Sequence, residues 1–514
     1  MLKNVIENYL TSIREVEFFG PFKSLLEGLG YYDIHLIHSS VEFGKDFIAK
    51  KDTQEGTIQY CFQIKIGDIN LNKFTNEIKP QLLEIVTNSL SHPNFDKSIP
   101  LEIIFVTTGN LKPPATIAFQ NFNNYINKTL KTKSILTWEK DQIISDFYKI
   151  GIEPFFELHN SPEFAGRFFN LFSQIKNGEQ LSSFDITFYT DHWLNLDLNI
   201  SENKLQVWFE GYFFSKLLFE NKNYYESVLF LVALCRVLIK NDLFDDNSEI
   251  LLNSIKGNID AFYIDLSKSI ATNKETTLFG NGFLSIFTYP LTCLKSLELL
   301  SLYSLLFDDI EQDKINLMDL LLKEKGSYRI ISDNYAISMF FICQFLLKYN
   351  RIKDLKIYLN NCVVWICDRY EQNGISPIGY TTIEEYEQLM SEYLDGLNFH
   401  KRKTSFAAAI ILDICAYLND PEFYSNVAND FKAVEIIPEY YHIDTLETLF
   451  DYNKVITQTD YDFKLELKDD FTDYIKYRNE KFSISLAKDK LYLLAILLRD
   501  RYFPKIFLNN QLII

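Results

Sequence analysis

The chain has 514 residues, of which 47% are hydrophobic and 15% aromatic, and its net charge is −18. This composition excludes an intrinsically disordered chain, a collagen-like chain and a small disulfide-stabilised scaffold. Because a single domain rarely grows past about 250–300 residues, the length predicts two or more domains. The acidic total argues against nucleic-acid binding, which depends on clustered Lys and Arg, unless the charge is unevenly distributed.

The seven cysteines lie mostly in apolar runs, and none has the CxxC or Cys/His spacing of a zinc site. This pattern indicates free, buried thiols in the reducing cytosol. The first residues lack the apolar segment of a signal peptide, and no run reaches the ~18 apolar residues of a membrane-spanning helix. We therefore expect a soluble cytoplasmic protein with no membrane partner.

The first 150 residues mix helical and strand patterns. In chain order the patterns predict a helix over 3–29, strands over 33–40, 46–52 and 60–67, a helix over 72–90, a strand over 101–109, a helix over 114–126, a strand over 134–138 and a helix from 141. Gly20-Pro21 is expected to interrupt the first helix, because proline lacks an amide hydrogen. This order predicts an α/β domain with a mixed sheet and helices on both of its faces.

Long helical patterns dominate from residue 221 onward. Four of them are each followed by a polar break and a second helical run, and they cover 224–241, 294–307, 336–350 and 406–419. This pattern predicts a large, mostly α-helical C-terminal region of helical hairpins, without a legible repeat consensus. We therefore expect an α/β domain over 1–152, a helical domain over 221–514, and between them a segment over 153–220 that is either a connector or part of the helical domain.

The candidate chemistry lies in the hairpin formed by the second and third predicted strands. Side chains alternate along a strand, so Gln63 and Lys65 share one face of the third strand while its other face is apolar. Asp46 begins the preceding strand, and a hairpin brings it toward this pair. A carboxylate, an amide oxygen and a lysine at one end of a sheet suit Mg²⁺-dependent hydrolysis of a phosphodiester. The alternative is a solvated sheet edge.

Residues 15–150 resemble the restriction-endonuclease-like PD-(D/E)xK nucleases, and most closely the Mrr-type branch, whose motif is Gly-x-Asp…Gln-x-Lys. The matching segments are Gly44-Lys45-Asp46, Gln63-Ile64-Lys65, the helix end Leu29-Gly30-Tyr31, FVTTG at 105–109 and LTWEKDQIISDF at 136–147. The motifs are short, so the specificity of the resemblance lies in their order and spacing. The resemblance implies a restriction-endonuclease-like fold for the N-terminal domain.

The resemblance also implies roles for individual residues. Asp46 would be the main metal ligand and Lys65 the catalytic lysine. Gln63 would replace the usual acidic ligand and coordinate through its amide oxygen, together with the backbone carbonyl of Ile64.

The family often adds a carboxylate from the first helix, for which Glu17 is the first candidate and Glu15 the alternative. Lys45, Lys73 and Lys79 lie near the motif and are candidates for contacts with nucleic-acid phosphates. The alternative for these three lysines is a solvated face.

The function implied by the resemblance is a Mg²⁺- or Mn²⁺-dependent DNA endonuclease with a bacterial restriction or anti-phage role. Because a free nuclease is toxic, we expect the helical region to hold it inactive until a trigger acts on it. The alternatives for the trigger are a modified base, a phage component, a small signalling nucleotide and a regulatory partner protein. Cutting both strands normally takes two sites, so a homo-oligomer is expected. The alternatives are a catalytically inactive nucleic-acid-binding scaffold for protein interactions, and an RNA-directed nuclease of the same fold.

The charge is in fact unevenly distributed. Residues 1–150 hold 16 Lys and Arg against 17 Asp and Glu, a net charge of −1, so the remaining 364 residues carry −17. The objection to nucleic-acid binding therefore applies to the helical region, which suits regulation or assembly better than DNA contact.

Three other groups of residues are weaker candidates. His35 and His38 are three apart, which on a strand places them on opposite faces and argues against a shared metal. Trp193 and Trp208 would line a pocket or, more simply, belong to the core. The basic run 400–403 is a candidate phosphate contact, and its alternative is a basic helix cap.

Overall fold

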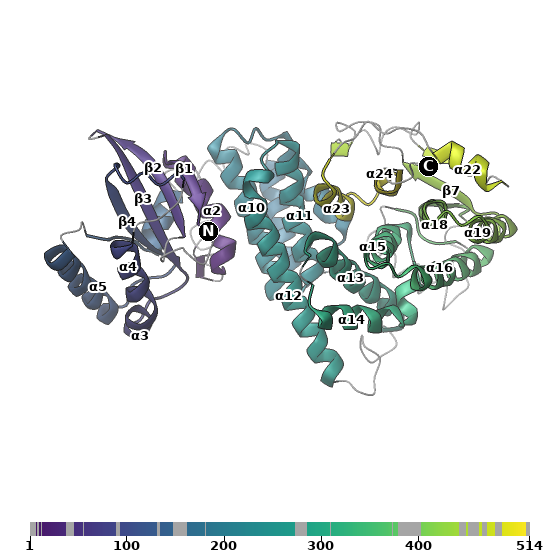
Figure 1. Cartoon of the computed structure of the whole chain (residues 1–514), viewed down its shortest axis with the longest axis horizontal. Helices are drawn as coiled ribbons and strands as arrows, with labels where there is room; N and C mark the ends of the chain where they lie inside the picture. The colour runs from purple at the N-terminus through teal and green to yellow at the C-terminus, as the bar shows by residue number, and fades with distance from the viewer. Residues whose placement is uncertain are drawn as a thin grey trace. The chain divides into compact units, whose positions relative to one another are not determined.

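The computed structural model describes residues 7, 10–11, 13–37, 46–54, 56–88, 93–130, 134–147, 162–179, 181–272, 285–308, 310–372, 374–378, 402–441, 449–450, 462–464, 470–478 and 486–509. The chain forms two compact units (Figure 1). The sheet unit comprises Met1–Phe172, Leu196–Lys216 and Asn247–Ser254, and the helical unit comprises Ser173–Asn195, Leu217–Asp246 and Ile255–Ile514. The sheet unit thus reaches past residue 152, where the sequence analysis placed its end.

A five-stranded mixed sheet organises the sheet unit, and its spatial order follows the chain order. The strands are β1 (Tyr32–Leu36), β2 (Phe47–Thr53), β3 (Gly56–Lys65), β4 (Leu101–Thr107) and β5 (Leu136–Trp138). The first three strands pair antiparallel, whereas β4 runs parallel to β3 and β5 runs parallel to β4. The mixed sheet predicted from the sequence is confirmed, and β3 and β4 are its central strands.

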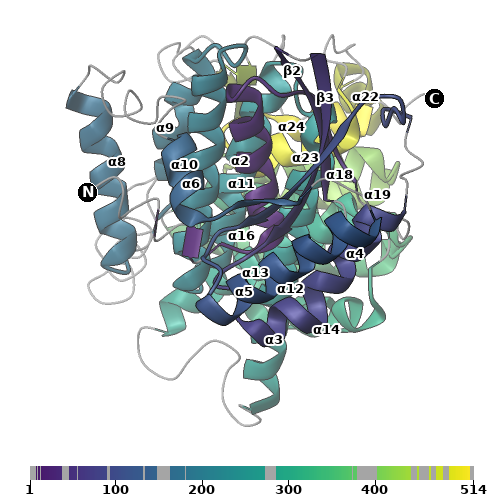
Figure 2. The ribbon, with the colours of Figure 1, turned by 90° about the vertical axis from the view of Figure 1, so that its left-hand side faces the viewer.

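Helices cover both faces of this sheet. They are α2 (Glu15–Gly28), α3 (Leu71–Lys73), the π-helical turn η1 (Phe74–Ile78), α4 (Lys79–Thr87), α5 (Pro113–Tyr125), the π-helical turn η2 (Ile126–Leu130) and α6 (Lys140–Phe147). In Figure 2 the viewer looks onto the face that α4 and α5 cover, and α2 lies on the other face. The predicted order of helices and strands over the first 150 residues is therefore confirmed.

The predicted break at Gly20-Pro21 is wrong, because α2 runs through Pro21 as one helix of 14 residues. Pro21 removes one amide donor from the helix. Phe18, Phe22 and Leu25 on the same helix are nevertheless fully buried. Their packing stabilises the helix more than the missing hydrogen bond costs, since most helical stability in proteins comes from tertiary contacts.

The two faces of the sheet bury different side chains. Toward α2, Phe22 meets Phe47, Phe62 and Trp138 at ring-centroid distances of 5.9, 5.5 and 6.2 Å. Toward α4 and α5, Cys61 belongs to an aliphatic and aromatic cluster with residues of both helices. Strand β3 is therefore buried on both faces, and Gln63 lies inside the protein rather than on a solvated sheet edge.

The helical unit consists mainly of helices, and some of them follow one another after a turn of a few residues. Its helices include α9 (Ser183–Thr190), α11 (Tyr224–Lys240), α13 (Ser285–Leu306), α14 (Gln312–Leu322), α15 (Ala336–Lys348), α16 (Ile352–Gln372), α18 (Phe406–Tyr417), α19 (Pro421–Ala433), α22 (Phe471–Arg478), α23 (Lys488–Leu497) and α24 (Phe503–Asn509). Three further helices cross the division between the units, namely α8 (Pro162–Lys176), α10 (Ser201–Glu220) and α12 (Ser248–Thr272). The mostly helical C-terminal region is confirmed, and the aromatic runs between 181 and 215 are helical.

Polar residues in the left-handed region end several of these helices. Asn350 between α15 and α16, and Asn419 between α18 and α19, have φ values of 54° and 49°. Asn tolerates this conformation better than most residues, and it frees the chain to reverse direction after a helix. The helices that follow pack beside the helices that precede them (Figure 1). The sequence breaks at these two positions therefore do mark hairpin turns.

A second sheet in the helical unit was not predicted. It has the order β6-β7-β8, formed by β6 (Thr404–Ser405), β7 (Ile437–Tyr441) and β8 (Asp462–Lys464). Over the described part of the chain, no helix is both long enough and apolar enough to cross a membrane. All seven cysteines are free thiols, and six of them are buried.

Candidate active site

Asp46 and Gln63 face each other across the hairpin, as the sequence predicts. Phe47 of β2 pairs with Phe62 of β3, and the Asp46 amide donates to the Phe62 carbonyl at 2.9 Å. This register places Asp46 opposite Gln63. One carboxylate oxygen, Oδ2 of Asp46, accepts from Gln63 Nε2 at 3.0 Å and from the Ile64 amide at 2.5 Å.

The side-chain oxygen of Gln63 is buried and lacks a hydrogen-bond partner. Gln63 is only 2% exposed, so water does not replace the missing donor at its surface. A buried acceptor without a donor costs about 1–3 kcal/mol. The amide contacts Asp46 through its nitrogen, so a half-turn of the amide plane would bring this oxygen toward the carboxylate. In that orientation the pair would offer two hard oxygen ligands of the kind that Mg²⁺ prefers. Among the described residues, no group of three or more His, Cys, Asp and Glu is placed to hold a metal, so any ion here would rest on this mixed carboxylate and amide set.

Ile64 contributes its amide to Asp46, whereas the resemblance assigns its carbonyl to a metal. The N–H group of Ile64 orients the Asp46 carboxylate against β3. The contact therefore fixes the position of the Asp46 carboxylate at the end of the hairpin.

Lys65 is paired with Glu15 of the first helix. Its ammonium lies 3.0 Å from Glu15 Oε1 and 3.3 Å from Oε2. The Lys65 side chain is 15% exposed and that of Glu15 is 35% exposed. A first-helix carboxylate thus does lie at this end of the sheet, and it is Glu15, the second candidate. The side chain of Glu17, the first candidate, lies outside the described residues.

The three lysines proposed to contact phosphates differ in their surroundings. Lys73 is half-buried, and its ammonium donates to the Ile66 carbonyl at 2.9 Å. Lys79 is exposed on α4. Lys45 lies outside the described residues. Lys73 therefore supports the chain beside Lys65, and Lys79 is the better placed of the two for a ligand in solution.

The weaker candidates have structural partners where they are described. His35 Nε2 lies 2.7 Å from Asp33 Oδ1, whereas His38 lies outside the described residues. Trp193 and Trp208 are buried side chains of the core.

The described half of the basic run 400–403 is ion-paired within the helical unit. Arg402 Nη1 lies 2.8 Å from Asp333 Oδ2, and Lys403 pairs with Glu435. Positions 400 and 401 lie outside the described residues. The pair of Arg402 with the buried Asp333 favours a structural role for Arg402, whereas Lys403 and Glu435 form an exposed ion pair.

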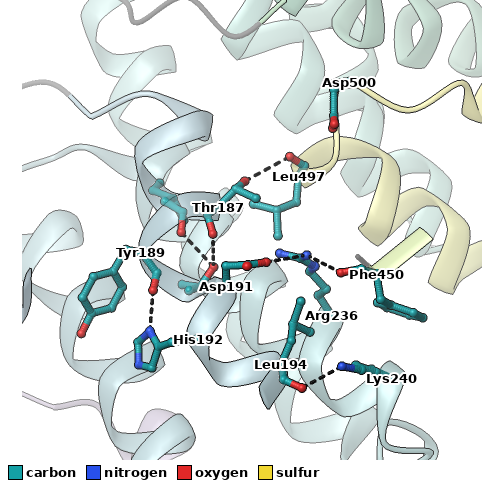
Figure 3. A network of polar contacts seen from close by, with 12 residues as sticks. Thr187, Tyr189, Asp191, His192, Leu194, Arg236, Lys240, Phe450, Leu497 and Asp500 are labelled. Carbon is teal, nitrogen blue, oxygen red and sulfur yellow. Dashed lines mark hydrogen bonds and ion pairs between the residues drawn. The ribbon is translucent and has the colours of Figure 1, made fainter. Parts of the chain in front are cut away.

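A buried polar network in the helical unit was not singled out from the sequence (Figure 3). Arg236 of α11 is 1% exposed, and its Nη2 donates to Asp191 Oδ1 and to the Phe450 carbonyl, both at 3.2 Å. Burial, and then the charge of Arg501, lower the pKa of Arg236 to about 10. Arg501 is held in turn by Asp500 at 2.7 Å. Each guanidinium has its own carboxylate, so the network links segments of the helical core.

The turn that follows β4 was also not assigned a role from the sequence. Thr107 and Thr108 are fully buried there and hydrogen-bond the chain just beyond Lys65. The sequence signal is the TTG tripeptide at the end of an apolar strand, because glycine and short hydroxyl side chains are typical of tight turns.

Comparison of the chain with protein-family models, with curated proteins and with solved structures gives no match.

Proposed function

We propose that the chain is a metal-dependent DNA endonuclease of the PD-(D/E)xK type, with an Mrr-like Gly-x-Asp…Gln-x-Lys site in its sheet unit. The observation that carries the proposal is the contact of Asp46 with Gln63 and Ile64 at the end of β3, where Lys65 also leaves the strand. Two antiparallel strands and one first-helix carboxylate thus bring together the residue types that phosphodiester hydrolysis requires.

The residues present fit a Mg²⁺ or Mn²⁺ ion. Asp46 would hold it through its carboxylate and Gln63 through its buried amide oxygen, with the Ile64 carbonyl as the third protein ligand. When bound, such an ion polarises the phosphate and lowers the pKa of a water molecule.

Lys65 would stabilise the charge that develops on the phosphate as the bond breaks. Its pairing with Glu15 holds the ammonium in place, and the carboxylate balances its positive charge before the substrate binds. A phosphate group would then compete with Glu15 for Lys65. Glu15 thereby becomes available to orient water or to assist the metal site.

The helical unit is proposed to regulate or assemble the nuclease. The residues after position 150 carry a net charge of −17, which disfavours their contact with DNA. We propose a cytoplasmic restriction or anti-phage effector that acts as a homo-oligomer and is triggered through its helical unit by a regulatory protein or a small nucleotide.

The test is a cleavage assay on the full chain with plasmid DNA and structured RNA, in Mg²⁺, Mn²⁺ or EDTA. We expect metal-dependent DNA cutting that falls by about 100-fold or more in Lys65→Ala, because removal of one preorganised charge-stabilising group typically costs 10²–10³ in rate. Lys128→Ala is the matched control, since Lys128 is exposed on η2. An equal loss of cutting activity in both variants, or a cutting rate that Lys65→Ala leaves unchanged, would contradict the proposal. Cutting of RNA in preference to DNA would instead support an RNA nuclease.

A second candidate is a nucleic-acid-binding scaffold that does not cut. It is favoured by the internal pairing of the site, since Asp46 is already bound by β3 and Lys65 by Glu15. This candidate predicts binding to DNA that is unchanged by EDTA, with no cutting in any metal. Binding measured by fluorescence anisotropy beside the cleavage assay distinguishes the two candidates.

A further inference from the structure

The turn after β4 holds the end of β3 through two buried hydroxyl groups. Thr107 Oγ1 donates to the Gly67 carbonyl at 2.7 Å, and the Gly67 amide donates to Thr108 Oγ1 at 3.0 Å. The Thr108 amide donates to the Lys65 carbonyl at 3.2 Å. Both threonines are 0% exposed. Both backbone polar groups of Gly67, two residues beyond Lys65, are therefore bonded to the threonine hydroxyls.

The two chain segments approach so closely that the turn has no room for a side chain at Gly109. A Cβ atom there would lie 2.3 Å from the Asp68 amide nitrogen and 2.3 Å from the Gly67 carbonyl carbon. Gly67 itself has a φ of +73°, which side chains rarely adopt. The close approach fixes the path of the backbone as it leaves β3.

The same turn is anchored on its other side by the segment that follows β5. The Lys140 amide donates to the Gly109 carbonyl at 2.9 Å, and the Leu111 amide donates to Glu139 Oε2 at 2.8 Å. The turn therefore bonds to chain on both sides and cannot shift without breaking one set of contacts.

An ion pair at the surface links the turn to the end of β3 a second time. Asp68 Oδ1 accepts from the Asn110 amide at 2.9 Å, and Asp68 Oδ2 lies 2.6 Å from Lys112 Nζ. Asp68 and Lys112 are each half-exposed, so this contact can be changed without altering the core.

We infer that residues 107–112 form a clasp that positions Lys65 for its reaction partner. The inference rests on the proposed function, and it assigns Thr107, Thr108 and Gly109 as positioning residues that act through the backbone of 66–68. The clasp fixes where β3 ends, and thereby where the Lys65 ammonium projects. Catalysis is sensitive to displacements of this kind, since a misplacement of about 1 Å can cost about 100-fold in rate.

The test compares Thr108→Val and Thr108→Ser in the full chain. Valine keeps the shape of threonine and removes its hydroxyl, whereas serine restores the hydroxyl. Thr87→Val is the matched control, because Thr87 Oγ1 donates to the Leu83 carbonyl on α4, away from the clasp. If Thr108→Val does not fold, the exposed variant Asp68→Asn replaces it.

Two readouts are needed. One is the separate effect of each variant on kcat and on KM in DNA cleavage. The other is the chemical shift of the Lys65 resonance in metal-free, ¹³C-dimethylated protein, assigned by its loss in Lys65→Arg. We expect Thr108→Val to lower kcat about tenfold or more with KM unchanged within about twofold, and to move the Lys65 resonance, while Thr108→Ser restores both.

The inference is overturned if Thr108→Val and Asp68→Asn match Thr87→Val in both readouts. If the wild-type chain cuts neither DNA nor RNA, the proposed nuclease function fails, and the Lys65 resonance alone decides whether the clasp positions this lysine. A resonance that moves in Thr108→Val and returns in Thr108→Ser then supports the clasp, and one that does not move refutes it.

Discussion

Arg499 and Glu298 form a buried ion pair in the helical unit. Arg499 Nη1 and Nη2 donate to the two carboxylate oxygens of Glu298 at 2.7 and 2.6 Å, and the Tyr225 hydroxyl donates to Glu298 Oε1 at 2.7 Å. Burial alone would lower the pKa of Arg499, but Glu298 raises it above its ordinary value. We expect Arg499→Met to lower the free energy of unfolding by about 3–5 kcal/mol, because a buried carboxylate then loses its counter-charge.

Guanidinium unfolding measures this loss, and the double variant Arg499→Met/Glu298→Gln is its control. Removing both charges leaves no unpaired ion in the core, so the double variant is expected to regain most of the stability. A single variant as stable as the wild type would contradict the prediction. So would a double variant that is less stable than the single one.

The contact between Asp46 and Gln63 was predictable from the sequence because it is local. Asp46 and Gln63 belong to neighbouring strands of one hairpin, and strand alternation together with a short turn determines which side chains face each other. The pairing of Lys65 with Glu15 spans 50 positions and depends on the rotation of α2 against the sheet. Side chains two positions apart on a helix point in very different directions, so sequence alone could not choose between Glu15 and Glu17.

At the scale of single elements, Asp420 caps α19. Its Oδ1 accepts from the Phe423 amide at 3.0 Å, Pro421 occupies the first helical position, and Lys356 pairs with the other carboxylate oxygen. The hydrogen bond from Lys356, and then that from the Phe423 amide, hold the pKa of Asp420 below its usual value. We expect Asp420→Ala to lower the free energy of unfolding by about 1 kcal/mol at neutral pH, as loss of a helix cap typically does.

The pH dependence of this loss has a definite sign. A carboxylate whose pKa is lowered on folding contributes stability above its unfolded value near 3.9, and it loses that contribution as the pH falls through its folded value. The difference in melting temperature between wild type and Asp420→Ala is therefore expected to be constant from pH 7 down to about pH 5 and to shrink below about pH 4. Asp420→Asn keeps an oxygen acceptor for the cap and should lose less. A difference in melting temperature that grows as the pH falls would contradict the assignment of Asp420 as an ionised helix cap.

The order of elements in the sheet unit was predictable from apolar periodicity, whereas three local features were not. Helix α2 continues through Pro21 because its tertiary packing overrides a local breaker. The π-helical turn η1 precedes Pro80, which lies in the first turn of α4, where a missing amide hydrogen costs little. The sheet β6-β7-β8 has strands of only two to five residues, too short to show a period of two.

On the scale of the whole molecule, the sheet unit includes segments that the sequence pattern assigned to the connecting segment or to the helical domain. Lys204 Nζ lies 2.8 Å from Glu27 Oε2, and Lys23 Nζ donates to Asn247 Oδ1 at 3.1 Å, so 196–216 and 247–254 contact α2. Contacts between distant segments carry no signature in the periodicity of either segment. The sequence pattern shows that helices dominate from residue 221 onward, and it does not show where the compact unit ends.

The division of charge leads to a prediction for DNA binding by the whole chain. Residues 1–150 are almost neutral and the rest carry −17, so we expect weak binding with few phosphate contacts. Each neutralised phosphate adds about 0.9 to the slope of log affinity against log salt, so about three contacts would cost about 40-fold between 50 and 200 mM NaCl.

Lys79 is the lysine that we expect to contribute to this slope, because it is exposed on α4, whereas Lys73 is engaged with the Ile66 carbonyl. In the Lys65→Ala background, where we expect cutting to be about 100-fold slower, Lys79→Ala should lower the salt slope by about one and weaken binding to all DNA sequences alike. Lys128→Ala should leave the slope unchanged. Strands β4 and β5 are parallel, so α5 and η2 return the chain from the end of β4 to the start of β5, and Lys128 lies at the opposite end of the strands from Lys65. Fluorescence anisotropy with a 20-base-pair duplex, about two helical turns, measures the slope. Equal slopes for Lys79→Ala and Lys128→Ala would show that Lys79 makes no phosphate contact, and the nucleic-acid face of the sheet unit would have to lie elsewhere.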